Sequence, residues 1–201
     1  MILPGQGWAR RIGAAFLLML CAACSGGAPG GRVATPSRAF NDAPARQIVL
    51  VHRSGEKLDV TYWRRGSGYD GKAMDAISRM LRDHKADQTA RIAPELVDYM
   101  AALVYRLGLP PETAIEVLSG YRSPATNAAL ARGNGRVARE SWHMNGMAVD
   151  IRIPGLTGRA TAEIAKTLQR GGAAWYDDSD HIHLDVGPIR TWNAQTGRAS
   201  G

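Results

Sequence analysis

The sequence predicts an α+β domain in which a small antiparallel sheet is flanked by helices. Two kinds of segment point to this class: short stretches in which apolar and polar residues alternate, as in half-exposed strands, and longer stretches with helical apolar spacing. Such a mixture packs as layers around one core. The 201 residues, 45% hydrophobic and 21% charged, are sufficient for one globular domain with appendages.

An export signal is expected over residues 1–24. Arg10 and Arg11 precede an apolar run at residues 12–20, which is too short to span a bilayer, and small residues follow it. The paired arginines also resemble a twin-arginine signal. The protein is therefore expected to be exported to the periplasm.

Two interpretations remain for the end of this signal. Residues 20–24 resemble a bacterial lipoprotein box, in which Cys24 is lipidated and anchors the protein to the membrane. The alternative is a plain signal peptide cut near Ala23. Because the only two cysteines of the chain, Cys21 and Cys24, lie here, no disulfide framework is expected in the exported domain.

A flexible tether is expected at residues 25–46, which are rich in Gly, Ala, Pro, Ser and Arg without periodicity. The folded domain is expected over residues 47–192, followed by a tail at 193–201. Its first element is a hairpin, in which β-rich segments at 47–52 and 57–64 are joined by a turn that contains glycine.

Helices and short strands follow the hairpin. Apolar residues at helical spacing predict helices over 72–84 and 94–107; in the second, Pro94 takes the favoured first turn and Gly108 the C-terminal stop. The remaining elements are strands at 115–118, 147–153 and 181–186, and helices at 126–132 and 161–170. No internal repeat interrupts this order.

The formal net charge of +7 favours contact with a polyanion or an anionic surface. The chain has no long Lys/Arg run and no basic stripe with interleaved aromatic residues. Nucleic acid is therefore not the expected partner.

Three side chains have the chemistry of a catalytic zinc site: His143, Asp150 and His183. Such a site uses three protein ligands and leaves a fourth position for water. On one helix, His143 and Asp150 would lie two turns apart, too far to chelate one ion. A loop that carries His143, a turn at Gly146 and a strand that carries Asp150 would let them converge.

The last expected strand has one polar and one apolar face. His181, His183 and Asp185 alternate with Ile182 and Leu184, so the three polar side chains project from one side. Two imidazoles on one face are typical of a strand that lines a site.

Each of these residues also has a simpler interpretation. A single histidine is most often a surface or hydrogen-bonded residue, as expected for His52 and His84. Asp150 could cap a helix or pair with an arginine. The spacing alone leaves the metal site and these structural roles open.

The segment Ser141-x-His143-x-x-Gly146-x-Ala148-x-Asp150 resembles the signature of the zinc D-Ala-D-Ala metallopeptidases. Similar motifs extend this resemblance over residues 49–192, among them Ser54-Gly55-Glu56, Ser119-Gly120-Tyr121-Arg122-Ser123-Pro124, Thr126-Asn127 and His183-Leu184-Asp185-Val186-Gly187-Pro188. The pattern is most similar to the YcbK-like murein endopeptidase branch. This resemblance implies a Hedgehog/DD-peptidase-like fold and a Zn²⁺ cofactor.

The resemblance also assigns roles to single residues. The zinc ligands are matched by His143, Asp150 and His183. Asp180 takes the place of the general base, which is Glu in the better-known members, and Arg122 matches the arginine that stabilises the tetrahedral intermediate or holds substrate. His181 replaces a more usual apolar residue, and it is either a second proton-transfer or oxyanion group or an exposed strand histidine.

The implied function is a zinc-dependent murein endopeptidase that hydrolyses the peptide cross-links of peptidoglycan in the bacterial cell envelope. The expected partners are peptidoglycan stem peptides, whose free carboxylates suit Arg122. Two alternatives remain: a D,D-carboxypeptidase or dipeptidase that trims stem peptides, and a non-catalytic peptidoglycan-binding module. A missing ligand or base would favour the module.

Overall fold

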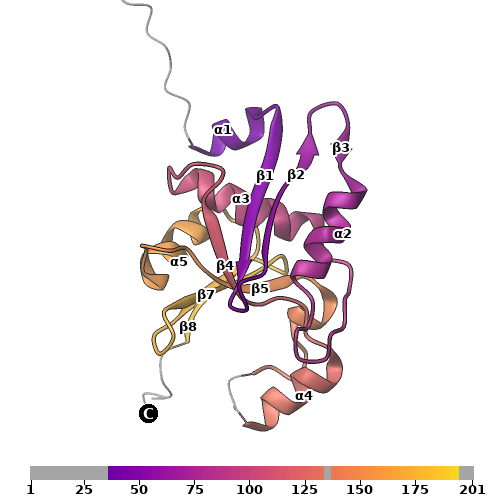
Figure 1. The fold of residues 1–201 in the computed structure, drawn as a ribbon. Helices are drawn as coiled ribbons and strands as arrows, with labels where there is room; N and C mark the ends of the chain where they lie inside the picture. The colour runs from indigo at the N-terminus through magenta and orange to yellow at the C-terminus, as the bar shows by residue number, and fades with distance from the viewer. Residues whose placement is uncertain (1–35, 134–136, 195–201) are drawn as a thin grey trace, which may run out of the picture. The chain divides into compact units, whose positions relative to one another are not determined.

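The computed structural model describes residues 36–133 and 137–194; the expected export signal, with Cys21 and Cys24, lies outside them. None of the helices in the described ranges is long and apolar enough to span a bilayer. The elements are, in chain order, α1 (Pro36–Asp42), β1 (Ala45–His52), β2 (Lys57–Arg64), β3 (Gly68–Tyr69), α2 (Gly71–Met80), α3 (Pro94–Arg106), β4 (Ala114–Ser119), α4 (Pro124–Gly133), a 3₁₀ turn (Trp142–Asn145), β5 (Ala148–Arg152), α5 (Gly158–Thr167), β6 (Gly172–Tyr176), β7 (His181–Asp185) and β8 (Arg190–Ala194) (Figure 1).

The strands of the described residues form one eight-stranded sheet in the order β3-β2-β1-β4-β5-β7-β6-β8. Neighbouring strands are antiparallel except for two parallel pairs, β1 with β4 and β6 with β8. The α+β class is confirmed, but the sheet is larger than expected and mixed. Parallel pairing of β1 with β4 requires a long crossover, and the segment that contains α2 and α3 supplies it.

The expected hairpin is present, with register from Ala45 opposite Arg64 to Val51 opposite Lys57. The helix expected at 72–84 ends earlier, at Met80. Strands β3, β6 and β8 were not expected. In β6 the run of Gly172 and two alanines has no alternation of apolar and polar residues, so it lacks the signal by which the other strands were found.

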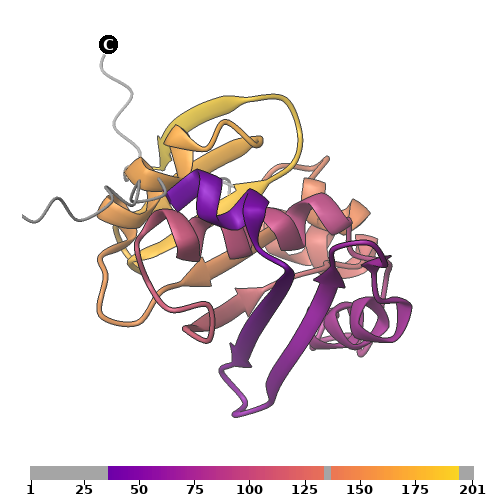
Figure 2. The same cartoon turned by 90° about the horizontal axis from the view of Figure 1, so that it is seen from above.

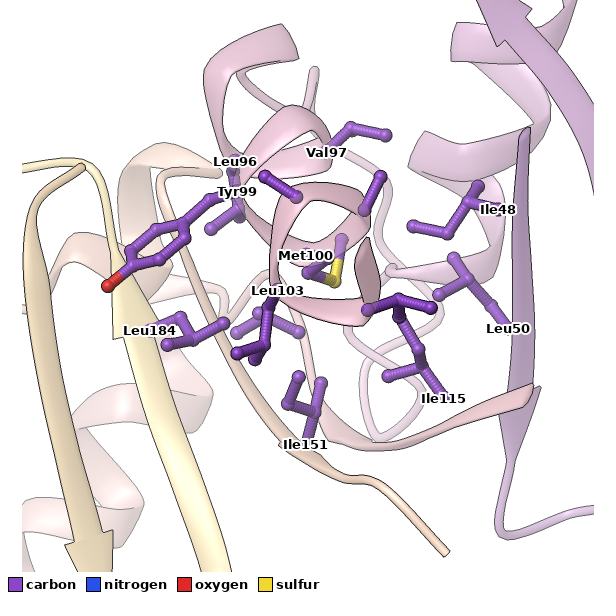
Figure 3. Close-up of a cluster of buried hydrophobic side chains, with 14 of the residues drawn as sticks. Ile48, Leu50, Leu96, Val97, Tyr99, Met100, Leu103, Ile115, Ile151 and Leu184 are labelled. Atoms are coloured by element: carbon purple, nitrogen blue, oxygen red, sulfur yellow. The ribbon is translucent and has the colours of Figure 1, made fainter. Parts of the chain in front are cut away.

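Helix α3 forms the centre of the core. Pro94 starts it, and both faces of the helix are buried against neighbouring elements. Figure 3 shows its side chains between those of β1 on one side and β7 on the other, with β4 and β5 between. The labelled residues of this cluster are Leu96, Val97, Tyr99, Met100 and Leu103 of α3, Ile48 and Leu50 of β1, Ile115 of β4, Ile151 of β5 and Leu184 of β7.

Part of the expected tether belongs to the fold. Helix α1 lies beside α3 (Figure 2), and the side chain of Phe40 is only 1% exposed. Its ring meets Tyr105 edge-on at 5.6 Å, and the guanidinium of Arg46 lies 4.3 Å from its centroid. The folded domain therefore begins before residue 47, because one aromatic side chain holds this polar, proline-containing segment against the core.

Candidate metal centre

Strands β5 and β7 place Asp150 and His183 directly opposite each other in an antiparallel pair. Their neighbours Val149, Ile151 and Leu184 point into the core beneath α3. Because side chains alternate along a strand, Asp150 and His183 leave the other face of the sheet.

His143 approaches this face from the 3₁₀ turn. Ser141 begins the turn, with its side chain accepting a hydrogen bond from the N–H of His143. Gly146 ends it in the left-handed region, with φ of 66°, and a Cβ there would lie 2.2 Å from the carbonyl oxygen of Arg91. Glycine is therefore required at 146 for both reasons, and the expected loop, turn and strand arrangement is present.

The three side chains converge at the surface of the sheet. His143 Nε2 lies 3.2 Å from His183 Nδ1 and 3.3 Å from Asp150 Oδ1, and His183 Nδ1 lies 2.9 Å from the same oxygen. A tetrahedral zinc site with bonds of about 2.0–2.1 Å separates its ligand atoms by about 3.3 Å. The donor atoms of this group therefore have the separation that a zinc ion requires.

The hydrogen bonds of the two rings select the nitrogen that faces the centre. His143 Nδ1 donates to the carbonyl oxygen of Gly120 at 2.7 Å, because a carbonyl can only accept. His183 Nε2 lies 3.1 Å from Asp185 Oδ2 and donates to that carboxylate. Each neutral ring consequently turns a lone pair toward Asp150, as metal ligation requires.

Burial lowers the pKa of His143, although Asp150 opposes the shift. Burial would also lower the pKa of His183, but its hydrogen bonds to Asp150 and Asp185 outweigh this effect and raise it. For Asp150, burial opposes the charged form, yet His143, His183 and Arg122 hold the pKa well below its usual range. The centre therefore keeps an ionised carboxylate beside two imidazoles, a set for which a proton and a metal ion compete.

Arg122 is brought into the site, where it contacts a candidate ligand directly. Its Nε donates to Ser119 Oγ at 2.8 Å, and a terminal nitrogen donates to Asp150 Oδ2. The other carboxylate oxygen of Asp150 is left facing the histidines. Arg122 thus orients Asp150 and supplies positive charge at the edge of the centre.

Asp180 is not brought into the site. Its Oδ1 accepts a hydrogen bond from the N–H of Gly158 at 2.7 Å, at the start of α5. Helix α5 packs on the core face of the sheet, opposite the candidate centre. Asp180 immediately precedes β7 with a left-handed backbone, φ of 45°, and its hydrogen bond to Gly158 holds the carboxylate at the start of α5. This geometry therefore does not support the expected role of Asp180 as the base.

His181 lines the cleft instead. Its Nδ1 lies 2.7 Å from Ser179 Oγ, which lies 3.0 Å from Asp178 Oδ1, and its ring stacks on Tyr176 at 4.5 Å. When Ser179 donates to Asp178, the Nδ1 proton of His181 points to Ser179 and Nε2 is left as an acceptor. Burial lowers the pKa of His181, which favours this neutral form.

A family model described as peptidoglycan L,D-endopeptidase MepK matches residues 41–192. The chain belongs to this family. Its members are M15 peptidases, so the YcbK-like murein endopeptidase resemblance is confirmed.

Curated relatives of the same family cover most of the chain. A protein of Haemophilus influenzae named probable peptidoglycan L,D-endopeptidase MepK is 34% identical over 147 residues, which are 72% of this chain and 78% of the relative. Peptidoglycan L,D-endopeptidase MepK of Escherichia coli K12 is 30% identical over 160 residues, which are 79% of this chain and 86% of the relative. No solved structure matches the chain.

A cleft of about 490 Å³ opens above the centre of this MepK family member, and part of its wall was not singled out from sequence. Trp142, Glu140, Tyr176 and Arg190 line it. Trp142 lies between Ser141 and His143 of the family motif, and Arg190 follows the motif that ends at Pro188. Tyr176 belongs to β6, which the sequence did not reveal as a strand.

Proposed function

We propose that the protein is a zinc-dependent peptidoglycan endopeptidase that hydrolyses peptide cross-links in the periplasm. The convergence of His143, Asp150 and His183 at ligand spacing carries this proposal, because it occurs in a cleft of a MepK family member. The relatives are named L,D-endopeptidases, and we assign the same bond type to this chain.

Zinc would be held by His143 Nε2, Asp150 Oδ1 and His183 Nδ1. The residues fit such an ion because both histidines are anchored through their other nitrogen and Asp150 is held by Arg122. When bound, zinc activates a water molecule and polarises the amide carbonyl of the substrate.

His181 is the proposed proton-transfer residue. Its Nε2 can accept the proton of the attacking water and pass it to the leaving amine, while Ser179 and Tyr176 hold the ring. Arg122 places a fixed positive charge where negative charge develops on the carbonyl oxygen. Because Arg122 also binds Asp150, its orientation does not depend on substrate.

The shape of the cleft favours an endopeptidase over an enzyme that trims free ends. A second cavity adjoins the first along the site, and the two share Arg122, Leu130, Asp150, Ser179 and His181 as lining residues. A peptide can therefore extend to both sides of the centre. The presence of all three candidate ligands also argues against a binding module that has lost catalysis.

The remaining parts of the proposal concern fold and location. The mixed sheet with a metal centre on one face supports a Hedgehog/DD-peptidase-like fold. Residues 1–24 are proposed as an export signal, with Cys24 as the lipidated anchor if the lipoprotein interpretation holds. If Cys24 is lipidated, globomycin should change the size of the expressed protein, and the Cys24→Ser variant should not show this change. A size that globomycin leaves unchanged would indicate a plain signal peptide.

Digestion of purified peptidoglycan tests the function. The wild-type protein should release muropeptides whose masses identify cleaved L,D cross-links, a chelator should stop the release, and added zinc should restore it. His143→Ala should be inactive and lack bound metal. Release of single D-alanine residues without loss of cross-links would instead assign a carboxypeptidase.

A further inference from the structure

The second cavity has a volume of about 580 Å³ and lies between the β1–β2 turn, the segment after α2 and the end of β4. It is rich in positive side chains: Arg53, Arg82, Lys85 and Arg122 line it, together with His52 and His84. The acidic lining residues are Asp83 and Asp150.

Most of these charges already have partners within the protein. Arg82 forms ion pairs with Glu56 at 3.0 Å and with Asp87 at 2.9 Å. The carboxylate of Asp83 is used by backbone N–H groups, at 2.9 Å from Ser123 and 3.0 Å from Lys85. Neither residue is available to neutralise another charge in the cavity.

Arg53 and Lys85 differ from the others. Both are exposed, and neither forms an ion pair with an acidic side chain in the described part of the chain. The guanidinium of Arg53 donates a hydrogen bond of 3.1 Å to the carbonyl oxygen of Leu118. Two cations without acidic partners at one cavity produce a local field that attracts an anion.

Two stacked histidines hold together the two chain segments that carry these cations. The rings of His52 and His84 are parallel, with centroids 3.7 Å apart. His52 directly precedes Arg53, and His84 directly precedes Lys85. His52 Nδ1 accepts from the N–H of Ser54, and His84 Nε2 lies 3.0 Å from the carbonyl oxygen of Met80, so each ring is also held by its own segment.

We propose that this cavity is a carboxylate-binding subsite, in which Arg53 and Lys85 bind a free carboxylate of the peptide substrate. The bond to be cleaved lies next to that carboxylate, at the candidate centre of His143, Asp150 and His183. This inference rests on the proposed function. Peptidoglycan stem peptides contain side-chain and terminal carboxylates, and the shared wall of the two cavities makes the subsite continuous with the centre. Arg53 and Lys85 therefore determine specificity and do not take part in the chemistry.

The test compares charge-removing variants on matched substrates. Arg53→Gln, Lys85→Gln and the double variant are assayed on cross-linked muropeptides with free carboxylates and on the same muropeptides after amidation. Lys57→Gln is the control, because Lys57 is an exposed cation of β2 outside both cavities. Binding of a stem tetrapeptide, free or amidated, is measured in parallel by titration calorimetry, which does not depend on cleavage.

The double variant should raise KM for the free-carboxylate substrate by about tenfold or more with kcat little changed, as expected for the loss of charged hydrogen bonds. Amidation should raise KM for the wild type similarly and should remove the difference between wild type and variants. If the variants match Lys57→Gln in KM and in tetrapeptide binding, the subsite is refuted while cleavage by the wild type upholds the function. Carboxylate-dependent tetrapeptide binding without any cleavage would uphold the subsite and refute the function.

Discussion

His183 Nε2 lies 3.1 Å from Oδ2 of Asp185, a carboxylate with no solvent exposure. Asp185 also accepts two hydrogen bonds from the guanidinium of Arg190, at 2.8 and 3.0 Å, and one from the N–H of Gly187. A carboxylate fixed in this way sets both the tautomer and the orientation of the histidine. This arrangement of carboxylate, histidine and metal is common in zinc proteins.

Asp185→Asn should weaken zinc binding by about 10–100-fold, because the amide no longer favours the tautomer that turns the Nδ1 lone pair of His183 toward the centre. Competition with a chromophoric zinc chelator measures the affinity, and circular dichroism checks the fold. Asp59→Asn, at an exposed position of β2, is the matched control. Unchanged affinity in a folded Asp185→Asn protein would show that His183 is oriented by other contacts.

Arg122→Ala should reduce both zinc affinity and turnover. The guanidinium holds one oxygen of Asp150, so its loss leaves a buried carboxylate with one partner fewer and frees the ligand to rotate. Arg122→Lys should recover only part of the activity, since lysine keeps the charge but cannot bind Ser119 and Asp150 in one planar arrangement. Zinc content measured alongside kcat separates the two effects, and normal values of both in Arg122→Ala would contradict the assignment.

Part of the candidate ligand set could be predicted from local sequence pattern. Gly146 marks a turn, the alternation after it marks a strand, and the two together bring His143 near Asp150. A second alternating strand offered both His181 and His183 as partners of Asp150, and the family resemblance selected His183. What local pattern could not give is register, and the pairing of Asp150 with His183 became visible only in the structure.

The elements that the sequence missed depend on distant contacts. Strand β6 has no alternation of its own and is a strand because β7 and β8 pair with its two edges. Helix α1 is held by Phe40 against α3, a contact across the chain that composition does not reveal. Asp180 was expected at the centre from its spacing to His183, but its carboxylate accepts a hydrogen bond from the distant N–H of Gly158, a contact that spacing does not reveal.

His181→Gln should keep zinc but lower kcat by about 10²-fold or more, as expected for the loss of a general base. Asp180→Asn should keep both zinc and most of the activity, because asparagine tolerates the left-handed backbone and can still accept from Gly158. Metal analysis and steady-state kinetics on the two variants make the comparison. The reverse result, with Asp180→Asn inactive and His181→Gln active, would return the role to Asp180.

Asp83→Asn should destabilise the protein at neutral pH by about 2 kcal/mol. Burial alone would raise the pKa of Asp83, but hydrogen bonds from Thr126, Ser123 and Ala86 outweigh it and lower the pKa from 3.8 to about 2. A carboxyl group with a depressed folded-state pKa contributes its stability above the unfolded-state value and loses it as the pH falls through the folded-state value. The difference in unfolding free energy between wild type and variant should therefore be constant above about pH 5 and shrink between pH 4 and 2.

Urea unfolding at a series of pH values measures this difference. Asp59→Asn is again the control and should change the free energy of unfolding by less than about 0.5 kcal/mol, since it lies on an exposed strand face. A difference for Asp83→Asn that stays constant down to pH 2 would mean that the lost hydrogen-bond geometry, and not the charge, causes the destabilisation. Asp83 connects the segment after α2 to Ser123, which lies beside Arg122 in the wall shared by the two cavities. Asp83→Asn should therefore also loosen this wall. A rise in KM for cross-linked muropeptides would reveal this effect.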